Sequence, residues 1–132
     1  TFNSGTLETT TVYISQTGGI SSENTAAGFG SVNGAGSGNP VTRTGEYNAS
    51  TITVSAAVAT ITFSKDLSNA TYTVVANGWD VTNTKVMFGE VTSQAAGSCA
   101  ITFRTATGTT PDLETSGMKW TWTVYGAKLK AS

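Results

Sequence analysis

The stretch Trp120-Thr121-Trp122-Thr123-Val124-Tyr125 alternates large apolar side chains with threonine. Successive side chains of a β-strand point to opposite faces of the sheet, so the tryptophans and the valine share one face and the threonines share the other. Shorter stretches of the same kind precede it at Ile61–Phe63, Tyr72–Val75, Val86–Phe88 and Ile101–Phe103. Together these stretches predict an all-β fold.

The second part of the chain is expected to hold most of the strands. They are predicted at residues 51–56, 58–64, 71–77, 84–92, 98–106 and 119–127. Asn77-Gly78 is the strongest turn signal between them, because both residues tolerate a positive φ. No window has a sustained helical period, and this strand spacing indicates an antiparallel sandwich or barrel.

The chain is predicted to form a single domain with two unequal parts. Residues 1–50 are expected to form an N-terminal strand, Thr9–Ser15, followed by an arm or loop rich in Gly, Ser and Asn. Residues 51–132 are expected to form the compact β unit. A Gly-rich stretch can cradle phosphate, but the glycine and lysine spacing of nucleotide-binding loops is missing here.

A hydrophobic core follows from the alternation in the predicted strands. Its expected members are Ile61, Phe63, Tyr72, Val74, Val86, Phe88, Ile101, Phe103, Trp120, Trp122 and Val124. Burial of each large side chain contributes about 1.5–3 kcal/mol. Chain entropy offsets most of this gain, so contacts with other copies of the chain would help.

The composition limits the classes of partner. Charged residues make up 11% of the chain, against roughly 25% in ordinary soluble domains. With a net charge of −1 and no long basic run, we expect no binding to nucleic acid. The lysines Lys119, Lys128 and Lys130 are predicted to be a solvated C-terminal end. No long apolar stretch and no signal-peptide pattern occurs, so we expect no membrane insertion.

Catalytic and metal-binding chemistry find little support. The chain has no histidine, which excludes Ser-His-Asp and Cys-His arrangements. Cys99, the one cysteine, shares a strand face with Ile101 and Phe103 and is predicted to be a core residue rather than a nucleophile. The carboxylates form no catalytic or calcium-binding motif. We therefore predict that the protein is not an enzyme and uses no metal or cofactor.

Binding is the better-supported activity. Trp79, Asp80 and Asn83 lie together after the expected turn, where an indole ring could stack on a sugar and the polar groups could bind its hydroxyls. The alternative is that Trp79 packs over the edge of the sheet and Asp80 caps a turn. Arg104 points away from the predicted core, where it could reach a ligand or a neighbouring subunit, or be simply solvated.

Two segments carry a resemblance to a known family. Ile61-Thr62-Phe63, a short turn and Tyr72-Thr73-Val74 are similar to a stretch of phage tail-fibre C-terminal domains. The ending Trp120-Thr121-Trp122-Thr123-Val124-Tyr125-Gly126 resembles the ending of those domains and of H-type lectins. The sugar-binding residues of H-type lectins do not map one by one onto this chain. The resemblance covers a little over half of it.

The resemblance implies an antiparallel β-sandwich of about six to seven strands that assembles as a homotrimer at the tip of a viral or phage tail fibre. The expected function is host attachment through a cell-surface glycan or an outer-membrane protein, from the virion or an extracellular location. Trp79, Asp80, Asn83 and Arg104 are the candidate ligand-binding residues.

A structural role is the alternative. The predicted strand at 9–15 precedes a long Gly-rich segment, and a tethered strand can complete a neighbour's sheet. The chain would then be a subunit of an extracellular filament or virion surface, assembled by β-strand addition.

Overall fold

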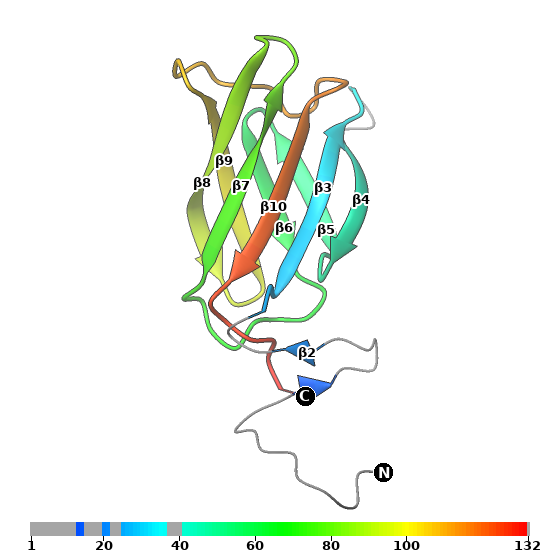
Figure 1. Ribbon diagram of the computed structural model, residues 1–132, viewed down its shortest axis with the longest axis vertical. Helices are drawn as coiled ribbons and strands as arrows, with labels where there is room; N and C mark the ends of the chain where they lie inside the picture. The colour runs from blue at the N-terminus through cyan, green and yellow to red at the C-terminus, as the bar shows by residue number, and fades with distance from the viewer. Residues whose placement is uncertain (1–12, 15–19, 22–24, 37–40, 132) are drawn as a thin grey trace, which may run out of the picture.

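The computed structural model describes residues 13–14, 20–21, 25–36 and 41–131, and these form an all-β structure (Figure 1). The strands are β1 Tyr13–Ile14, β2 Ile20–Ser21, β3 Gly28–Gly34, β4 Val41–Tyr47, β5 Thr51–Ser55, β6 Val58–Thr62, β7 Thr73–Asp80, β8 Lys85–Ala95, β9 Ser98–Thr105 and β10 Lys119–Tyr125. In this part of the chain, no helix is long and apolar enough to cross a membrane. The prediction of an all-β, antiparallel fold is confirmed.

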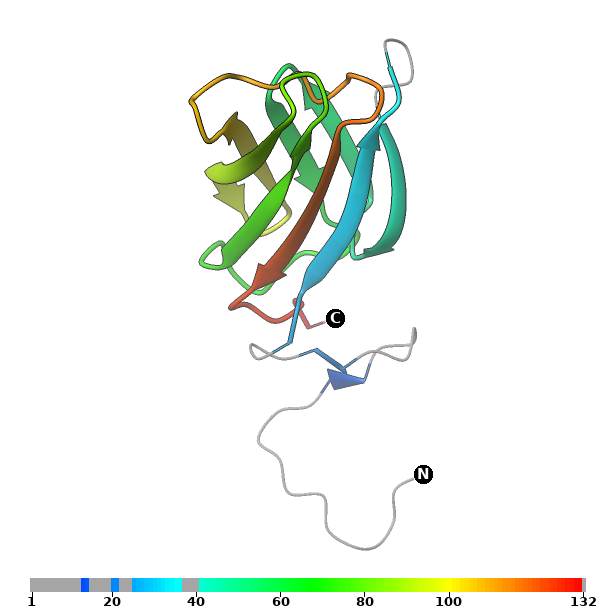
Figure 2. The same ribbon diagram turned by 45° about the horizontal axis from the view of Figure 1, so that its top comes forward.

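Eight of the strands form one antiparallel sheet with the order β4-β3-β10-β7-β8-β9-β6-β5. The sheet curls until its end strands approach each other, so it is nearly closed into a barrel (Figures 1 and 2). Arg43 of β4 donates to the carbonyl oxygen of Ser50, next to β5, over 3.3 Å. This single sheet of eight strands agrees with the barrel that the strand spacing allowed, and it corrects the β-sandwich of about six to seven strands that the resemblance implied.

The Gly-rich arm predicted within residues 16–50 is wrong for two segments, because β3 and β4 belong to the sheet. Gly28 and Gly30 face the interior, and Trp122 of the neighbouring strand fills the space above them. A Cβ atom at Gly28 would lie 2.9 Å from Cζ3 of Trp122, and one at Gly30 would lie 2.9 Å from Nε1. The alternation is present in β3, but glycine replaces the large apolar residues that make it visible.

The sheet also extends across the expected boundary at residue 50, since β3 and β4 precede it and the other six strands follow it. Those six strands match the predicted ones closely. Of the predicted strand Thr9–Ser15, only Tyr13–Ile14 lies within the described residues, where it pairs with Ile20–Ser21. The rest of that strand lies outside them.

Asn77-Gly78 does not form the expected turn, because both residues lie inside β7. Gly78 pairs with Trp120 of β10, and a Cβ atom there would lie 2.0 Å from the carbonyl oxygen of Lys119. This glycine permits a close approach of two strands rather than a reversal of the chain. The turn follows at residues 81–84, where Thr84 has a φ of 51°.

Most of the predicted core is buried, Val74 is partly buried, and two residues on β8 are exceptions. Val86 and Phe88 are exposed, and Met87 between them is the buried residue. Because all three side chains are apolar, the sequence does not decide whether Met87 or its two neighbours point inward. In the structure Met87 points inward, and Val86 and Phe88 are left on the outside of the sheet.

Cys99 is a core residue, as expected, and lies beside Tyr72. Burial raises the pKa of the Cys99 thiol to about 11, so the thiol stays protonated at neutral pH. Burial also raises the pKa of the Tyr72 hydroxyl. That hydroxyl lies 2.9 Å from the carbonyl oxygens of both Ala95 and Ser98, to which it can donate.

Candidate functional site

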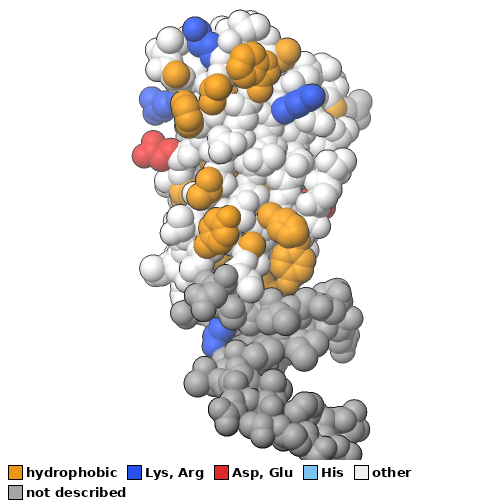
Figure 3. Space-filling model, viewed as in Figure 1, with side chains coloured by type: hydrophobic (Ala, Val, Ile, Leu, Met, Phe, Trp, Pro, Cys, Tyr) orange, Lys and Arg blue, Asp and Glu red, His pale blue; other side chains and the backbone are white. Residues whose placement is uncertain are grey.

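The outward face of β3, β10, β7 and β8 carries most of the large apolar side chains that remain exposed. They are Phe29, Val75, Trp79, Val86, Phe88 and Tyr125. Figure 3 shows hydrophobic side chains near both ends of this face, with polar surface between them. The face therefore has two apolar ends, one around Trp79 and the other around Phe29 and Tyr125.

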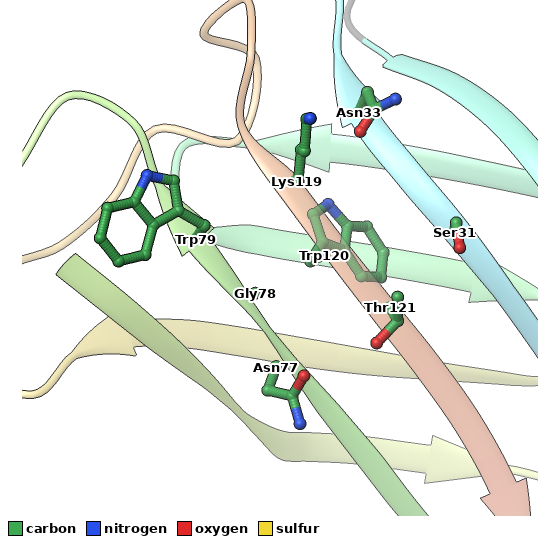
Figure 4. A pocket seen from close by; sticks show the side chains of 8 residues that line it. All are labelled: Ser31, Asn33, Asn77, Gly78, Trp79, Lys119, Trp120 and Thr121. Atoms are coloured by element: carbon green, nitrogen blue, oxygen red, sulfur yellow. The ribbon is translucent and has the colours of Figure 1, made fainter. Parts of the chain in front are cut away.

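A hollow of about 390 Å³ opens on this face beside Trp79 (Figure 4). The residues that line it are Ser31, Asn33, Asn77, Gly78, Trp79, Lys119, Trp120 and Thr121. The hollow combines an exposed indole ring with amide, hydroxyl and ammonium groups.

The strand register explains how these side chains meet. Lys119 of β10 lies opposite Asn33 of β3 on one side and opposite Trp79 of β7 on the other. In the next row of the same face, Thr121 lies opposite Ser31 and Asn77. Directly opposed residues have Cβ atoms about 4.5–5.5 Å apart, so the outward side chains in each row are neighbours.

The difference in side-chain size along these rows produces the hollow. Ser31 and Thr121 are short, whereas Trp79 is large and 43% exposed. Because Gly78 lets β7 approach β10 closely, the indole of Trp79 is held next to Lys119. All of the lining residues that the structure assigns to strands belong to one sheet, so little ordering is needed before a ligand binds.

Asp80 has the turn-capping role that the sequence left open as an alternative. Its side chain is fully buried, and Oδ1 accepts hydrogen bonds from the backbone amides of Thr82 (2.9 Å) and Asn83 (3.1 Å). The Asn83 side-chain amide donates to Oδ2 over 2.7 Å. Asp80 and Asn83 therefore shape the turn after Trp79, and the buried position of Asp80 corrects its predicted role as a ligand-binding group.

Arg104 lies on the same outward face as Trp79, but not in the hollow. It is exposed on β9 and lies opposite Phe88, which in turn lies opposite Asn77. Arg104 is therefore separated from the lining residue Asn77 by one strand. Of the four predicted site residues, the structure places Trp79 in the hollow and Arg104 within the same face.

The predicted lysine cluster is divided between the two ends of the barrel. Lys119 begins β10, whereas Lys128 and Lys130 follow its other end. Lys119 is thus a sheet residue at the hollow and not part of a solvated C-terminal end. No carboxylate among the described residues forms an ion pair with Lys119. The salt bridge found within the described part of the chain joins Arg43 and Glu46.

The lining of the hollow offers groups that can contact a ligand. It presents hydrogen-bond donors and acceptors, one cation and an aromatic ring, but no carboxylate or thiol. Over the described part of the chain, no group of three or more potential metal ligands comes together.

Sequence reasoning missed Asn77 and the lining residues of β3 and β10. Asn77 could have been found by extending the strand at 71–77 to Asp80, because Asn77 and Trp79 then share a face. The other lining residues could be found only from the strand order, which places β10 between β3 and β7. They are Ser31, Asn33, Lys119 and Thr121.

Comparisons of the chain with protein-family models, with curated proteins and with solved structures found no match.

Proposed function

We propose that this chain is a receptor-binding module that attaches to a cell-surface glycan through the hollow beside Trp79. The observation that carries the proposal is the exposed Trp79 indole in one hollow with the polar side chains of Asn33, Asn77 and Thr121. This is the function that the resemblance to tail-fibre tips and H-type lectins also predicts.

The lining of the hollow suits a sugar ring. One face of a pyranose is largely C–H and can stack on an indole, while its hydroxyl groups need both donors and acceptors at the sides. Asn33 and Asn77 each offer an amide donor and a carbonyl acceptor, and Thr121 offers a hydroxyl. A tryptophan gives a large contact area at a small cost in side-chain entropy.

The proposed setting is the virion surface or another extracellular location. The low content of charged residues and the many hydroxyl and amide side chains suit a module that works outside the cell. A surface protein is the competing kind of receptor. An open hollow of about 390 Å³ favours a sugar, because protein partners are usually held by a larger apolar centre.

Replacement Trp79→Ala tests this proposal. We expect it to weaken glycan binding at least about tenfold, because it removes the stacking surface. The measurement is binding to a glycan array, followed by titration calorimetry with the best ligand. Val58→Ala is the control, since Val58 is also an exposed apolar residue but belongs to β6 on another part of the sheet.

Equal binding by the wild type and Trp79→Ala would contradict the proposed site. If the wild type binds no glycan but adsorbs to cells in a way that protease treatment of the cells abolishes, the receptor is a protein and the proposal is wrong.

We also propose that the module assembles as a homotrimer through the other apolar end of the face. Phe29 stacks on Tyr47 with ring centroids 5.6 Å apart, and Val75 and Tyr125 are exposed nearby on β7 and β10. Exposed apolar side chains gathered on one part of a surface can mark an interface with another protein chain. The Trp79 hollows of the three copies would remain open for several sugars at once, which strengthens attachment.

The mass in solution tests the assembly. Size-exclusion chromatography with light scattering is expected to give three times the mass of the chain, and Tyr125→Ala is expected to lower it. A wild-type monomer would contradict the homotrimer. Open, growing polymers would instead support the filament subunit, for which the unpaired edges of β4 and β5 offer places for strand addition.

A further inference from the structure

We infer that the glycan carries an acidic group, and that Lys119 binds this group. The inference rests on the proposed function and narrows its ligand to sugars with a carboxylate, such as sialic and uronic acids, or with a sulfate ester. It follows from the charge of the hollow and from the position of its lysine.

Lys119 is the one charged residue among the eight that line the hollow. Figure 4 shows its side chain between those of Trp79 and Asn33, the residues opposite it in the strand register. A sugar stacked on the Trp79 indole would therefore have the ammonium group beside its ring. The side-chain amide of Asn33, on the other side of Lys119, can donate a further hydrogen bond to the same acidic group.

The carboxylates near the hollow do not neutralise Lys119. Asp80 is the next residue after Trp79, but its carboxylate is buried and accepts hydrogen bonds from the turn at Thr82 and Asn83. Glu90 is exposed on β8, where it lies opposite Thr102 of β9. Neither carboxylate lines the hollow, nor do Asp112 and Glu114 in the loop before β10. Among the described residues, no ion pair of Lys119 is found.

Arg104 adds a second cation to this end of the face. It is exposed two strands beyond β7 in the same row as Asn77, with Phe88 between them. Phe88 is 53% exposed and extends the apolar surface from the hollow toward Arg104. An acidic oligosaccharide that leaves the hollow over Phe88 would meet this guanidinium with its next charged unit.

The test is an array on which each acidic glycan has a neutral counterpart that lacks only the acidic group. Sulfated lactose with lactose forms one such pair, and sialyllactose with its carboxyl-reduced form is a second. Galacturonate oligomers with their carboxyl-reduced forms provide a third. We expect the wild type to bind acidic members at least about tenfold more tightly than their counterparts, which is the effect of one charge-assisted contact. The sialylated and sulfated members distinguish a carboxylate from a sulfate as the acidic group.

Lys119→Gln keeps a long side chain with a hydrogen-bond donor but removes the charge. We expect it to reduce the ratio of the affinities for acidic and neutral members to about one. Lys119→Arg is expected to retain the preference for acidic members. Lys130→Gln makes the same change in charge at the other end of the barrel and should leave the preference unaltered. Because the Lys119 side chain is exposed, we expect each variant to keep the fold, and urea unfolding verifies this.

Two results would overturn the inference and leave the proposed function standing. One is Trp79-dependent binding of neutral and acidic glycans with equal affinity. The other is a preference for acidic members that persists in Lys119→Gln. A wild type that binds no glycan at all would overturn the proposed function as well, so the two failures are distinguishable.

Discussion

Replacement Gly78→Ala is expected to destabilise the protein by about 3 kcal/mol, at the upper end of the cost of overpacking. The added Cβ atom would lie 2.0 Å from the carbonyl oxygen of Lys119 and 2.7 Å from Cα of Trp120. Both atoms belong to the backbone of β10, which cannot rotate away as a side chain can. The strands β7 and β10 must therefore separate, and the separation also moves Trp79 relative to Lys119.

Urea unfolding measures the cost, and Gly97→Ala is the matched control. A Cβ atom at Gly97 would lie 3.0 Å from Oδ1 of Asp66, an exposed side chain whose end can move aside. We expect the control to stay within about 1 kcal/mol of the wild type. If Gly78→Ala were as stable as Gly97→Ala, the close approach of β7 and β10 would be wrong.

Replacement Trp122→Ala is expected to cost about 3–5 kcal/mol, a large part of the total stability of a domain of this size. Trp122 is 1% exposed, and its indole covers Gly28 and Gly30 of β3. No nearby side chain on β3 can fill the resulting cavity, because the residues below the indole are glycines. The loss of this contact weakens the attachment of β3, and with it β4, to the sheet.

Two further variants separate this packing effect from a general effect of losing a tryptophan. Trp79→Ala should cost much less stability, because Trp79 is 43% exposed in the folded protein whereas Trp122 is 1% exposed. Trp122→Phe should cost less than Trp122→Ala, since it keeps an aromatic ring and removes an indole N–H that has no acceptor among the described residues. Equal stability losses in Trp79→Ala and Trp122→Ala, measured by urea unfolding, would contradict the burial of Trp122.

The strands from residue 51 onward could be predicted because their alternation uses large β-branched and aromatic residues. The strands β3 and β4 could not, because β3 turns glycines inward where other strands turn large side chains. That arrangement is recognisable only when Trp122 is known to lie beside β3. The placement of Val86 and Phe88 failed for a different reason, since Met87 between them makes both faces of β8 apolar.

The candidate site was predictable in part. Trp79 stood out as an aromatic residue among polar neighbours in the sequence. Asp80 follows it directly and Asn83 comes four residues after it. Successive side chains of a strand point to opposite faces, however, so Asp80 points inward and is buried. Apart from the residues of β7, the lining of the hollow comes from β3 and β10, which are far apart in the sequence and become neighbours only through the sheet.

The glycan site beside Trp79 is tested most directly by a ¹⁵N NMR titration of the protein with the glycan that binds best on the array. The chain has three tryptophans, so the indole N–H of Trp79 can be observed separately from those of Trp120 and Trp122. We predict that the Trp79 indole signal and the backbone amides of Asn77 and Lys119 shift with ligand concentration. Shifts confined to β4 and β5, with the Trp79 signal unchanged, would contradict the account.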